Sequence, residues 1–295
     1  MGLGDAGGLR PVTAGMRRML YLAAALVFGA GFPLLVFTEY TDKLFPWTID
    51  PPLTAAFLGA CYWSAGVLEW AAARERLWCR ARVAVPGVLL FTILTCIPTV
   101  ANLGHFNMRS PATYAWVAIY FGVPPVLGWL WWRQAAVRGE DEPRSLPLPG
   151  FMRAGYWALG GVLLASGAVL FAAPAAAAAL WPWDLNPPDS RYAQLSRMEP
   201  YVGVWLLGLG TVAVNTVLEN DFRRVRCVFA GGVALPALIG VAVLRYPGTV
   251  LWSRPTVAVF AVCLALLLAL SVAGLAKLRR ESMKNASGKP DAFES

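Results

Sequence analysis

The sequence predicts an all-α membrane protein, a polytopic bundle of eight transmembrane helices built as two tandem four-helix repeats. Hydrophobic residues make up 58% of the 295 residues and charged residues only 14%. A soluble domain is about one quarter charged, so most of this chain is suited to lipid. Eight apolar runs approach the length of about 20 residues that a spanning helix needs. The second half of the chain also repeats the first.

The repeat is clearest in one motif, which reads FPWTIDPP at residues 45–52 and WPWDLNPP at residues 181–188. Before the motif, matching residues are 136 positions apart. After it the spacing becomes 144, which pairs Gly59 with Gly203 and implies an insertion of 8 residues in the second copy. Because the matches include Gly, Pro and charged positions in one register, we interpret the two halves as tandem copies.

The spans follow from the apolar runs in chain order. Helices of this length satisfy every backbone group without water, and the runs are too long for the strands of a barrel. We expect spans at residues 19–37, 53–73, 83–101, 112–132, 155–180, 201–218, 228–244 and 256–276. Four spans per copy bring both copies into the membrane in the same direction, so a pseudo-two-fold axis along the membrane normal should relate them.

Five segments result from this division. They are an N-terminal cytoplasmic segment (1–18), a first four-helix repeat (19–133), a cytoplasmic linker (134–150), a second four-helix repeat (151–280) and a cytoplasmic tail (281–295). The linker is acidic and rich in proline, which predicts a short, exposed connector. The tail is polar and lacks periodicity, which predicts disorder.

Basic residues predict the orientation. All but six of the 25 Lys and Arg residues lie in segments on the same side as the N-terminus. The positive-inside rule therefore places both termini in the cytoplasm, and the Ala-rich, Arg-rich composition suits the inner membrane of a bacterium. Arg17 and Arg18 before an apolar run also suit a signal peptide. That run is the repeat partner of the fifth span, so we expect it to be a retained helix.

Several classes of protein are disfavoured. The formal charge of +8 does not predict nucleic-acid binding, because the basic residues lie at the ends of apolar runs and form no contiguous patch. The five cysteines lie in or beside apolar runs, which predicts neither a disulfide nor a zinc site. His105 is the only histidine and has no cluster of ligands near it in sequence. Nucleotide-binding, metalloprotease and nucleophile-elbow motifs are missing, so we expect no cofactor and no catalytic residue.

The repeated motif should lie outside, where the first helix of each copy ends. Its prolines enforce a stiff, extended segment. Trp47, Trp181 and Trp183 would sit at headgroup depth, where an indole buries its ring and keeps its N–H in water. An interfacial turn with aromatic anchors is the simpler interpretation, and a pair of half-sites for a lipid headgroup or a partner protein is the alternative. Asp50 becomes Asn186 in the second copy, so a charge-based site would be asymmetric.

Four arginines occupy matched positions in the inner turns, namely Arg80, Arg82, Arg224 and Arg226. Short basic loops of this kind fix topology and attract anionic lipid, with about 1 kcal/mol per residue near the surface. Topology together with an interfacial salt bridge is the simpler interpretation of these residues. A site for an anionic ligand or a cytoplasmic partner is the alternative.

Three polar residues are candidates for an intramembrane site. Glu69 is the only acid well inside an expected span, and there it can reach Arg74 or the interface by snorkelling. We therefore interpret it as structural, with a proton carrier as the alternative. Asn102 and Asn215 each predict a hydrogen bond between helices.

The motif pattern also carries a resemblance. The FPW motif at residues 45–47, followed by Pro51 and by Gly59 and Gly66 on the next helix, resembles an uncharacterised bacterial multi-pass membrane protein family with a repeated FPW-x-x-x-P motif. The resemblance covers both copies. It implies fold and membrane localisation only, because no activity attaches to that family.

These features favour a non-catalytic integral membrane protein, an accessory or scaffold subunit that packs against membrane lipids or other membrane protein subunits. Small-residue helix faces and scarce buried charge are its basis. The alternative is a transporter or channel for a small or lipidic solute, with a path between the two repeats. A membrane enzyme is the third and weakest interpretation.

Overall fold

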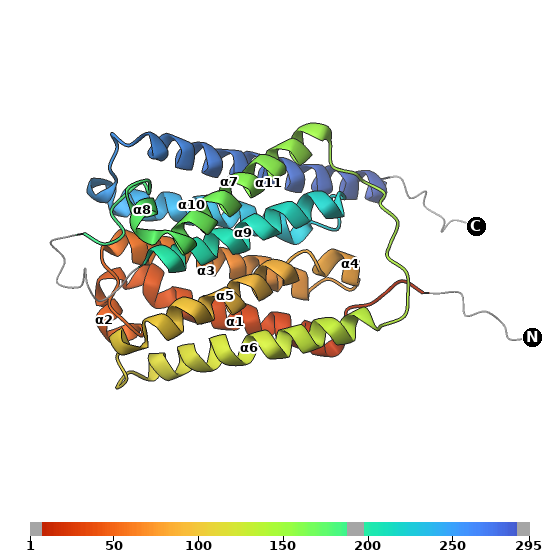
Figure 1. Cartoon of the computed structure of the whole chain (residues 1–295). Coiled ribbons are helices and arrows are strands. Elements are labelled where there is room, and N and C mark those ends of the chain that lie inside the picture. The colour runs from red at the N-terminus through yellow and green to blue at the C-terminus, as the bar shows by residue number, and fades with distance from the viewer. Residues whose placement is uncertain (1–7, 188–197, 288–295) are drawn as a thin grey trace, which may run out of the picture.

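A computed structural model of the chain describes residues 8–187 and 198–287, and within them the protein is a bundle of long α-helices (Figure 1). The long helices are α1 (Ala14–Val36), α3 (Pro52–Ala73), α5 (Val85–Ala101), α6 (Pro111–Ala135), α7 (Gly150–Ala172), α9 (Glu199–Glu219), α10 (Arg226–Arg245) and α11 (Pro255–Ser287). The shorter elements are η1 (Thr38–Tyr40), α2 (Thr41–Leu44), α4 (Trp78–Ala81), η2 (Leu103–His105), α8 (Pro174–Ala178) and η3 (Pro247–Thr249). Among the described residues, β structure is limited to two isolated bridges.

Six of the described helices are long and apolar enough to cross a membrane, namely α1, α6, α7, α9, α10 and α11. The fold is therefore an all-helical bundle compatible with a multi-pass membrane protein. Helix α5 has 17 residues and is shorter than these six. Helix α3 is long enough but less apolar, since it includes Tyr62, Ser64 and Glu69. Most residues of α3 are buried by other helices, so its composition is not set by contact with lipid.

The long helices coincide with the eight apolar runs of the sequence, with one clear difference. The fifth run was expected to be a single helix that reaches Leu180, whereas α7 ends at Ala172. Pro174 then starts the separate helix α8. A proline has no N–H to donate and disfavours the α conformation in the residue before it, so it suits the first turn of a new helix better than the interior of α7.

The packing order places α3 and α9 at the centre of the bundle. Helix α1 packs on α3 and α7 packs on α9, while α3 also packs on α10 and α9 on α5. Helices α6 and α11 lie outside, against α5 and α10 (Figure 1). Each central helix therefore touches helices from both halves of the chain.

The two ends of the bundle differ in character. One end, which we name the motif end, carries residues 37–51 and 173–187. The opposite end, the linker end, carries residues 74–84, 136–149 and 220–225, and the described chain also begins and ends there (Figure 1).

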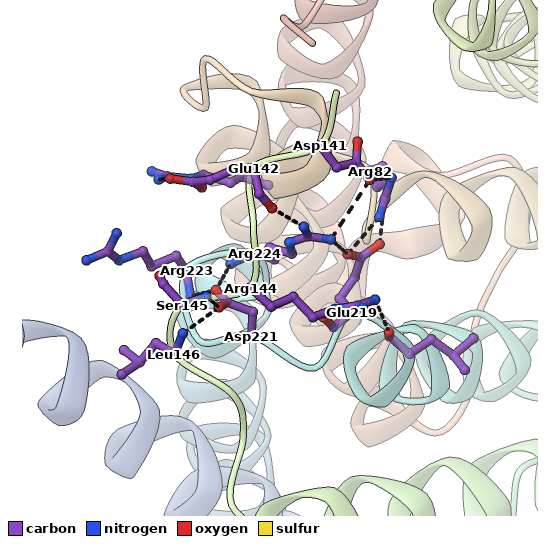
Figure 2. Close-up of polar contacts among 12 residues, drawn as sticks. Arg82, Asp141, Glu142, Arg144, Ser145, Leu146, Glu219, Asp221, Arg223 and Arg224 are labelled. Atoms are coloured by element: carbon purple, nitrogen blue, oxygen red, sulfur yellow. Dashed lines mark hydrogen bonds and ion pairs between the residues drawn. The ribbon is translucent and has the colours of Figure 1, made fainter. Parts of the chain in front are cut away.

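The linker between the halves is docked on the linker end, although many of its residues, including Pro143, Arg144 and Ser145, are exposed as expected (Figure 2). Glu142 accepts two hydrogen bonds from Arg80, at 2.6 and 2.8 Å, and Asp141 accepts one from Arg82 at 2.5 Å. Further along, the backbone N–H groups of Ser145 and Leu146 donate to the carboxylate of Asp221, at 2.9 and 2.8 Å. Charge-assisted hydrogen bonds of this kind are stronger than neutral ones and hold the linker in place.

Three of the four candidate arginines are therefore engaged within the protein. Glu219 lies between two of them, and accepts hydrogen bonds from Arg82, at 2.5 and 3.0 Å, and from Arg224, at 3.2 Å. Arg224 is buried and also donates to the carbonyl of Glu142. Arg80, Arg82 and Arg224 thus form ion pairs with the linker and with α9, in line with the expected salt bridge, and these pairs reduce the charge that they offer to lipid. Arg226 alone of the four is exposed.

The end of the chain also differs from expectation. Residues 281–295 were expected to be disordered, whereas α11 continues to Ser287. Within this extension the ammonium group of Lys277 lies 2.9 Å from the carboxylate of Glu281, four residues later on the same helix face. Such pairs stabilise exposed helices by about 0.2–0.5 kcal/mol. Residues 288–295 lie outside the described part.

Candidate functional site

The three tryptophans of the repeated motif are buried inside the protein. Trp47 is 5% exposed, Trp181 7% and Trp183 1%. The indole N–H of Trp47 donates to the sulfur of Met198 at 3.3 Å, and that of Trp183 donates to the hydroxyl of Thr54 at 3.0 Å. The expectation that these rings anchor at headgroup depth is wrong, because each turn folds back and inserts its indoles between helices. Pro188, which ends the second motif, lies outside the described residues.

Each motif forms an aromatic cluster at the motif end. In the first, Trp47 contacts Phe45, Trp116 and Tyr201, with ring centroids 4.8 to 4.9 Å apart. The second cluster has the same plan around Trp183. That ring contacts Trp181, Phe260 and Phe57 at 5.2 to 5.8 Å. In both clusters one contacting ring comes from the other half of the chain. Edge-on aromatic contacts of this kind add about 0.5–1.5 kcal/mol each beyond area burial.

Asp50 and Asn186 occupy the same place in the two motifs but are not equivalent in their surroundings. Asn186 donates to a carboxylate oxygen of Glu199 at 2.5 Å, at the start of α9. Asp50 is half-buried before Pro51. The asymmetry expected from the sequence is therefore present, and it serves to hold the start of α9.

A cavity of about 370 Å³ lies beside the second aromatic cluster, and we name it the α7–α11 cavity. Its walls come from α3, α7, α8, α9, α10 and α11 and are almost entirely apolar. Among the residues that line it are Phe57, Cys61, Leu206, Leu235, Ile239 and Phe260. This volume lies within the range of about 300–1,000 Å³ that is usual for small-molecule sites.

The matching place in the first half is filled. There the gap measures about 10 Å³, and its walls include Tyr62, Phe91 and Trp205. At the repeat spacing of 144, Cys61 corresponds to Trp205, and Leu206 and Leu235 correspond to Tyr62 and Phe91. The α7–α11 cavity thus exists because smaller side chains replace aromatic rings at matched positions.

The cavity reaches the outer surface of the bundle between α7 and α11. Four exposed apolar residues line it there, namely Val162, Val169, Leu180 and Val259. An apolar opening on the side of a membrane bundle faces acyl chains rather than water. A ligand could therefore enter from the bilayer.

Within the part of the chain that the structure describes, two polar atoms at the motif end of the cavity lack a hydrogen-bond partner. They are the indole nitrogen of Trp181 and the hydroxyl oxygen of Thr256, both buried and both on residues that line the cavity. Beside them Arg254 donates to the carbonyl of Trp181 and to the carboxylate of Asp184, at 2.8 Å each, so this cation is already neutralised. Because buried donors normally have partners, the two atoms indicate a ligand with an acceptor group at this end.

The intramembrane candidates differ in part from expectation. Glu69 is only 1% exposed and lines a second cavity, between the two halves, so the snorkelling interpretation is wrong. The amide nitrogens of Asn102 and Asn215 donate to Pro98 and Thr211 carbonyls of their own helices, at 2.7 and 3.0 Å. Both amide nitrogens therefore bond to a carbonyl one turn earlier in their own helix. Asn102 also interacts with the side chain of Tyr201 on α9, a contact between helices of the expected kind.

Arg226 lines a polar pocket at the linker end. The pocket measures about 480 Å³ and also contains Glu75, Arg223, Arg279 and Glu281. Burial raises the pKa of the Glu75 carboxyl, an effect that Arg80 and Arg226 oppose. Glu75 and Arg226 correspond by repeat position to Glu219 and Arg82. Within the described residues Glu219 and Arg82 form a hydrogen-bonded ion pair, whereas Glu75 and Arg226 interact only electrostatically.

The sequence did not point to the α7–α11 cavity. At the spacing of 144, Tyr62 and Phe91 of the first half correspond to leucines in the second, whereas Trp205 of the second half corresponds to Cys61 of the first. The three differences point to one cavity only when the fold is known. Comparisons with family models, curated proteins and solved structures found no match, so the site is interpreted from its own geometry.

Proposed function

We propose that the protein is a non-catalytic integral membrane protein of eight transmembrane helices that holds one lipid-like molecule in the α7–α11 cavity. The cavity, with its two unpartnered donors at one end and its opening toward the bilayer, is the observation that carries this proposal. The helices would form two tandem repeats in a bacterial plasma membrane, with the linker end in the cytoplasm.

Matched contacts support the tandem repeat. A Cβ on Gly59 would lie 2.6 Å from the backbone nitrogen of Leu35, and one on Gly203 would lie 2.8 Å from that of Phe171. These pairs correspond at the spacings of 136 and 144. Both glycines let two helices approach closely, as small residues do in membrane bundles.

Contacts between the halves follow the same rule. A Cβ on Gly87 would lie 2.8 Å from the carbonyl oxygen of Gly208, and one on Gly231 would lie 3.1 Å from that of Ser64. Residues 64 and 208 are matched, as are residues 87 and 231. Each contact joins one half to the other, which is what a pseudo-two-fold axis between the halves requires.

Eight crossings follow if α3 and α5 span together with their neighbours. Helix α3 packs between α1 and α10, and α5 between α6 and α9, all four of which are long and apolar enough to cross (Figure 1). An even number of crossings places both termini on one side. The linker end carries most of the arginines, which supports a cytoplasmic location for it.

The ligand chemistry follows from the bilayer as solvent. An apolar chain gains little by moving from lipid into an apolar cavity, so packing and hydrogen bonds must provide the preference. Trp181 and Thr256 offer two donors where water is scarce, and each unsatisfied donor costs about 1–3 kcal/mol. A single acyl or isoprenoid chain with an ester, carboxyl or hydroxyl group at the motif end meets both conditions.

The experiment is to purify the protein from its native membrane in mild detergent and to identify retained lipid by native mass spectrometry. We expect one lipid-like molecule per chain. Cys61→Trp places in the cavity the ring that Trp205 supplies at the matched place beside Trp47. It should lower retention to about one tenth, a change of about 1.4 kcal/mol in binding. Leu235→Phe is a milder version, should Cys61→Trp fold poorly.

Val241→Trp, on the exposed face of α10, is the matched control and should leave retention unchanged. Equal retention by the wild type and both cavity variants would overturn the proposal. A stoichiometric protein partner in the same preparation would support the accessory-subunit prediction, which stays a prediction.

A transporter for a small solute is the second candidate. The observation that favours it is the cavity between the two halves, because transporter sites commonly lie near the midplane where two repeats meet.

A further inference from the structure

The cavity between the two halves, which we name the central cavity, measures about 110 Å³. Its walls come from both halves, with Ser64 and Leu68 on α3 and the matched Gly208 and Val212 on α9. Among its lining residues Glu69 is the only charged one. The position matched to Glu69 is Ala213, which also lines the cavity, so the site carries one charge rather than two.

The carboxylate of Glu69 is buried and incompletely paired within the described part of the protein. Its side chain is 1% exposed, and its Oε2 atom makes no hydrogen bond. The nearby hydroxyl of Ser64 donates to the carbonyl of Cys61 at 2.9 Å, and one of the Tyr62 and Tyr120 hydroxyls donates to the other at 2.5 Å. An isolated buried carboxylate is unfavourable unless a counterion or a donor compensates it.

The rest of the wall suits an organic cation. Four aromatic side chains line the central cavity, namely Phe91, Tyr120, Tyr156 and Trp205. The faces of such rings attract cations, and aromatic cages are a common means of binding substituted ammonium groups. Hard metal ions are less suitable, because Ca²⁺ and Mg²⁺ take about six or more oxygen ligands and this wall supplies one carboxylate and hydroxyls that are already bonded.

We propose that the central cavity binds a small substituted ammonium ion, with Glu69 as its counterion and the aromatic side chains as its walls. The volume of about 110 Å³ corresponds to about four waters at about 30 Å³ each, which limits the ligand to a compact cation. This site adjoins the α7–α11 cavity and shares Leu163, Leu209 and Leu235 with it. Glu69 and the four aromatic side chains do not line the α7–α11 cavity, so the proposal does not depend on the lipid proposal.

The test uses the full-length protein in detergent and radiolabelled tetramethylammonium as the probe. We expect saturable binding of one ion per chain, competed by choline but not by K⁺ or by 3,3-dimethylbutanol, the neutral shape analogue of choline. Glu69→Gln should weaken binding at least about tenfold, and Phe91→Leu about three- to tenfold through loss of an aromatic face. Glu75→Gln, the same change outside the cavity, should leave binding unchanged.

Three results would overturn the proposal. They are the lack of saturable binding to the wild type, equal competition by K⁺ or the neutral analogue, and binding by folded Glu69→Gln that equals the wild type. If Glu69→Gln fails to fold, unchanged binding by Phe91→Leu would have the same meaning. Lipid retention measured in the same samples reports whether the α7–α11 cavity is occupied. Either proposal can therefore be overturned without the other.

Discussion

The two aromatic clusters at the motif end share a plan and differ in what lies beside them. Around Trp47 the neighbouring space is filled by rings, with a gap of about 10 Å³. Around Trp183 the corresponding space is a cavity of about 370 Å³. The backbone contacts that close the two motif ends also correspond. The N–H of Asn107 donates to the carbonyl of Pro46 at 2.8 Å, and that of Leu251 donates to Pro182 at 3.0 Å.

The difference shows that the same arrangement of helices can be closely packed beside one motif and leave a cavity beside the other. Contacts of the motif and of the helix crossings are common to both, whereas side-chain size at three positions differs. Replacing Trp205, Tyr62 and Phe91 by their counterparts Cys61, Leu206 and Leu235 removes most of the filling. Protein interiors are normally close-packed, so a void of this size has a specific cause.

The largest expected effect concerns what the halves share. Trp47→Ala and Trp183→Ala should each destabilise the folded protein by about 3–5 kcal/mol, because each removes a fully packed ring. The measurement is unfolding in detergent. Trp132→Ala, on an exposed ring of α6, is the control and should change stability much less. A Trp47→Ala effect no larger than that of Trp132→Ala would restore the interfacial-anchor interpretation.

The next effect compares the two Glu–Arg pairs at the linker end. Glu219→Gln should cost about 2 kcal/mol, because it weakens bonds to Arg82 and to buried Arg224 (Figure 2). Glu75→Gln should change stability by less than about 0.5 kcal/mol, since Glu75 makes no hydrogen bond to Arg226 within the described residues. Equal effects in the same unfolding assay would show that the two pairs are equivalent after all.

A smaller effect distinguishes the hydrogen bonds of the two motif tryptophans. Thr54→Val should cost about 1–3 kcal/mol, because it leaves the buried N–H of Trp183 unsatisfied. Met198→Leu should cost less than half as much, because a thioether sulfur is a weak acceptor for Trp47. Both replacements nearly conserve volume, so packing changes little. A larger loss for Met198→Leu would reverse this assignment.

The smallest effect is a pH dependence. Because burial raises the pKa of Glu75 in the folded protein, its protonated form is favoured there. The contribution of this group to stability is therefore constant above the raised value and grows as the pH falls toward about 4.3, its unfolded value. The wild type should gain stability relative to Glu75→Gln on acidification from neutral pH. A constant difference between the two proteins across that range would contradict the burial of Glu75.

The positions of the long helices could be predicted from the sequence, because apolar runs of spanning length leave few alternatives. The role of Trp47 and Trp183 could not. A tryptophan at the end of a span is typical of an interface, and nothing local shows that its turn folds inward. The ion pairs that dock the linker could not be predicted for a similar reason. Acidic and proline-rich segments are usually exposed, and the partners of Asp141 and Glu142 are about 60 residues away.

The candidate site depends on distant residues in the same way. Cys61 and Leu206 line one wall only after α3 and α9 pack together, and Thr256 comes from the last helix. Glu69 was correctly located within a long helix, yet its burial depends on the helices around α3. Comparing the two halves position by position shows where side-chain sizes differ. Only the fold shows that these positions line the same cavity.

The most direct measurement is an experimental structure of the protein in a nanodisc of native lipid, with both motif ends compared in the same map. The account predicts elongated density in the α7–α11 cavity, with a polar group within hydrogen-bond distance of the indole nitrogen of Trp181, and no such density beside Trp47. An empty or collapsed α7–α11 cavity, or equal density in both halves, would contradict it.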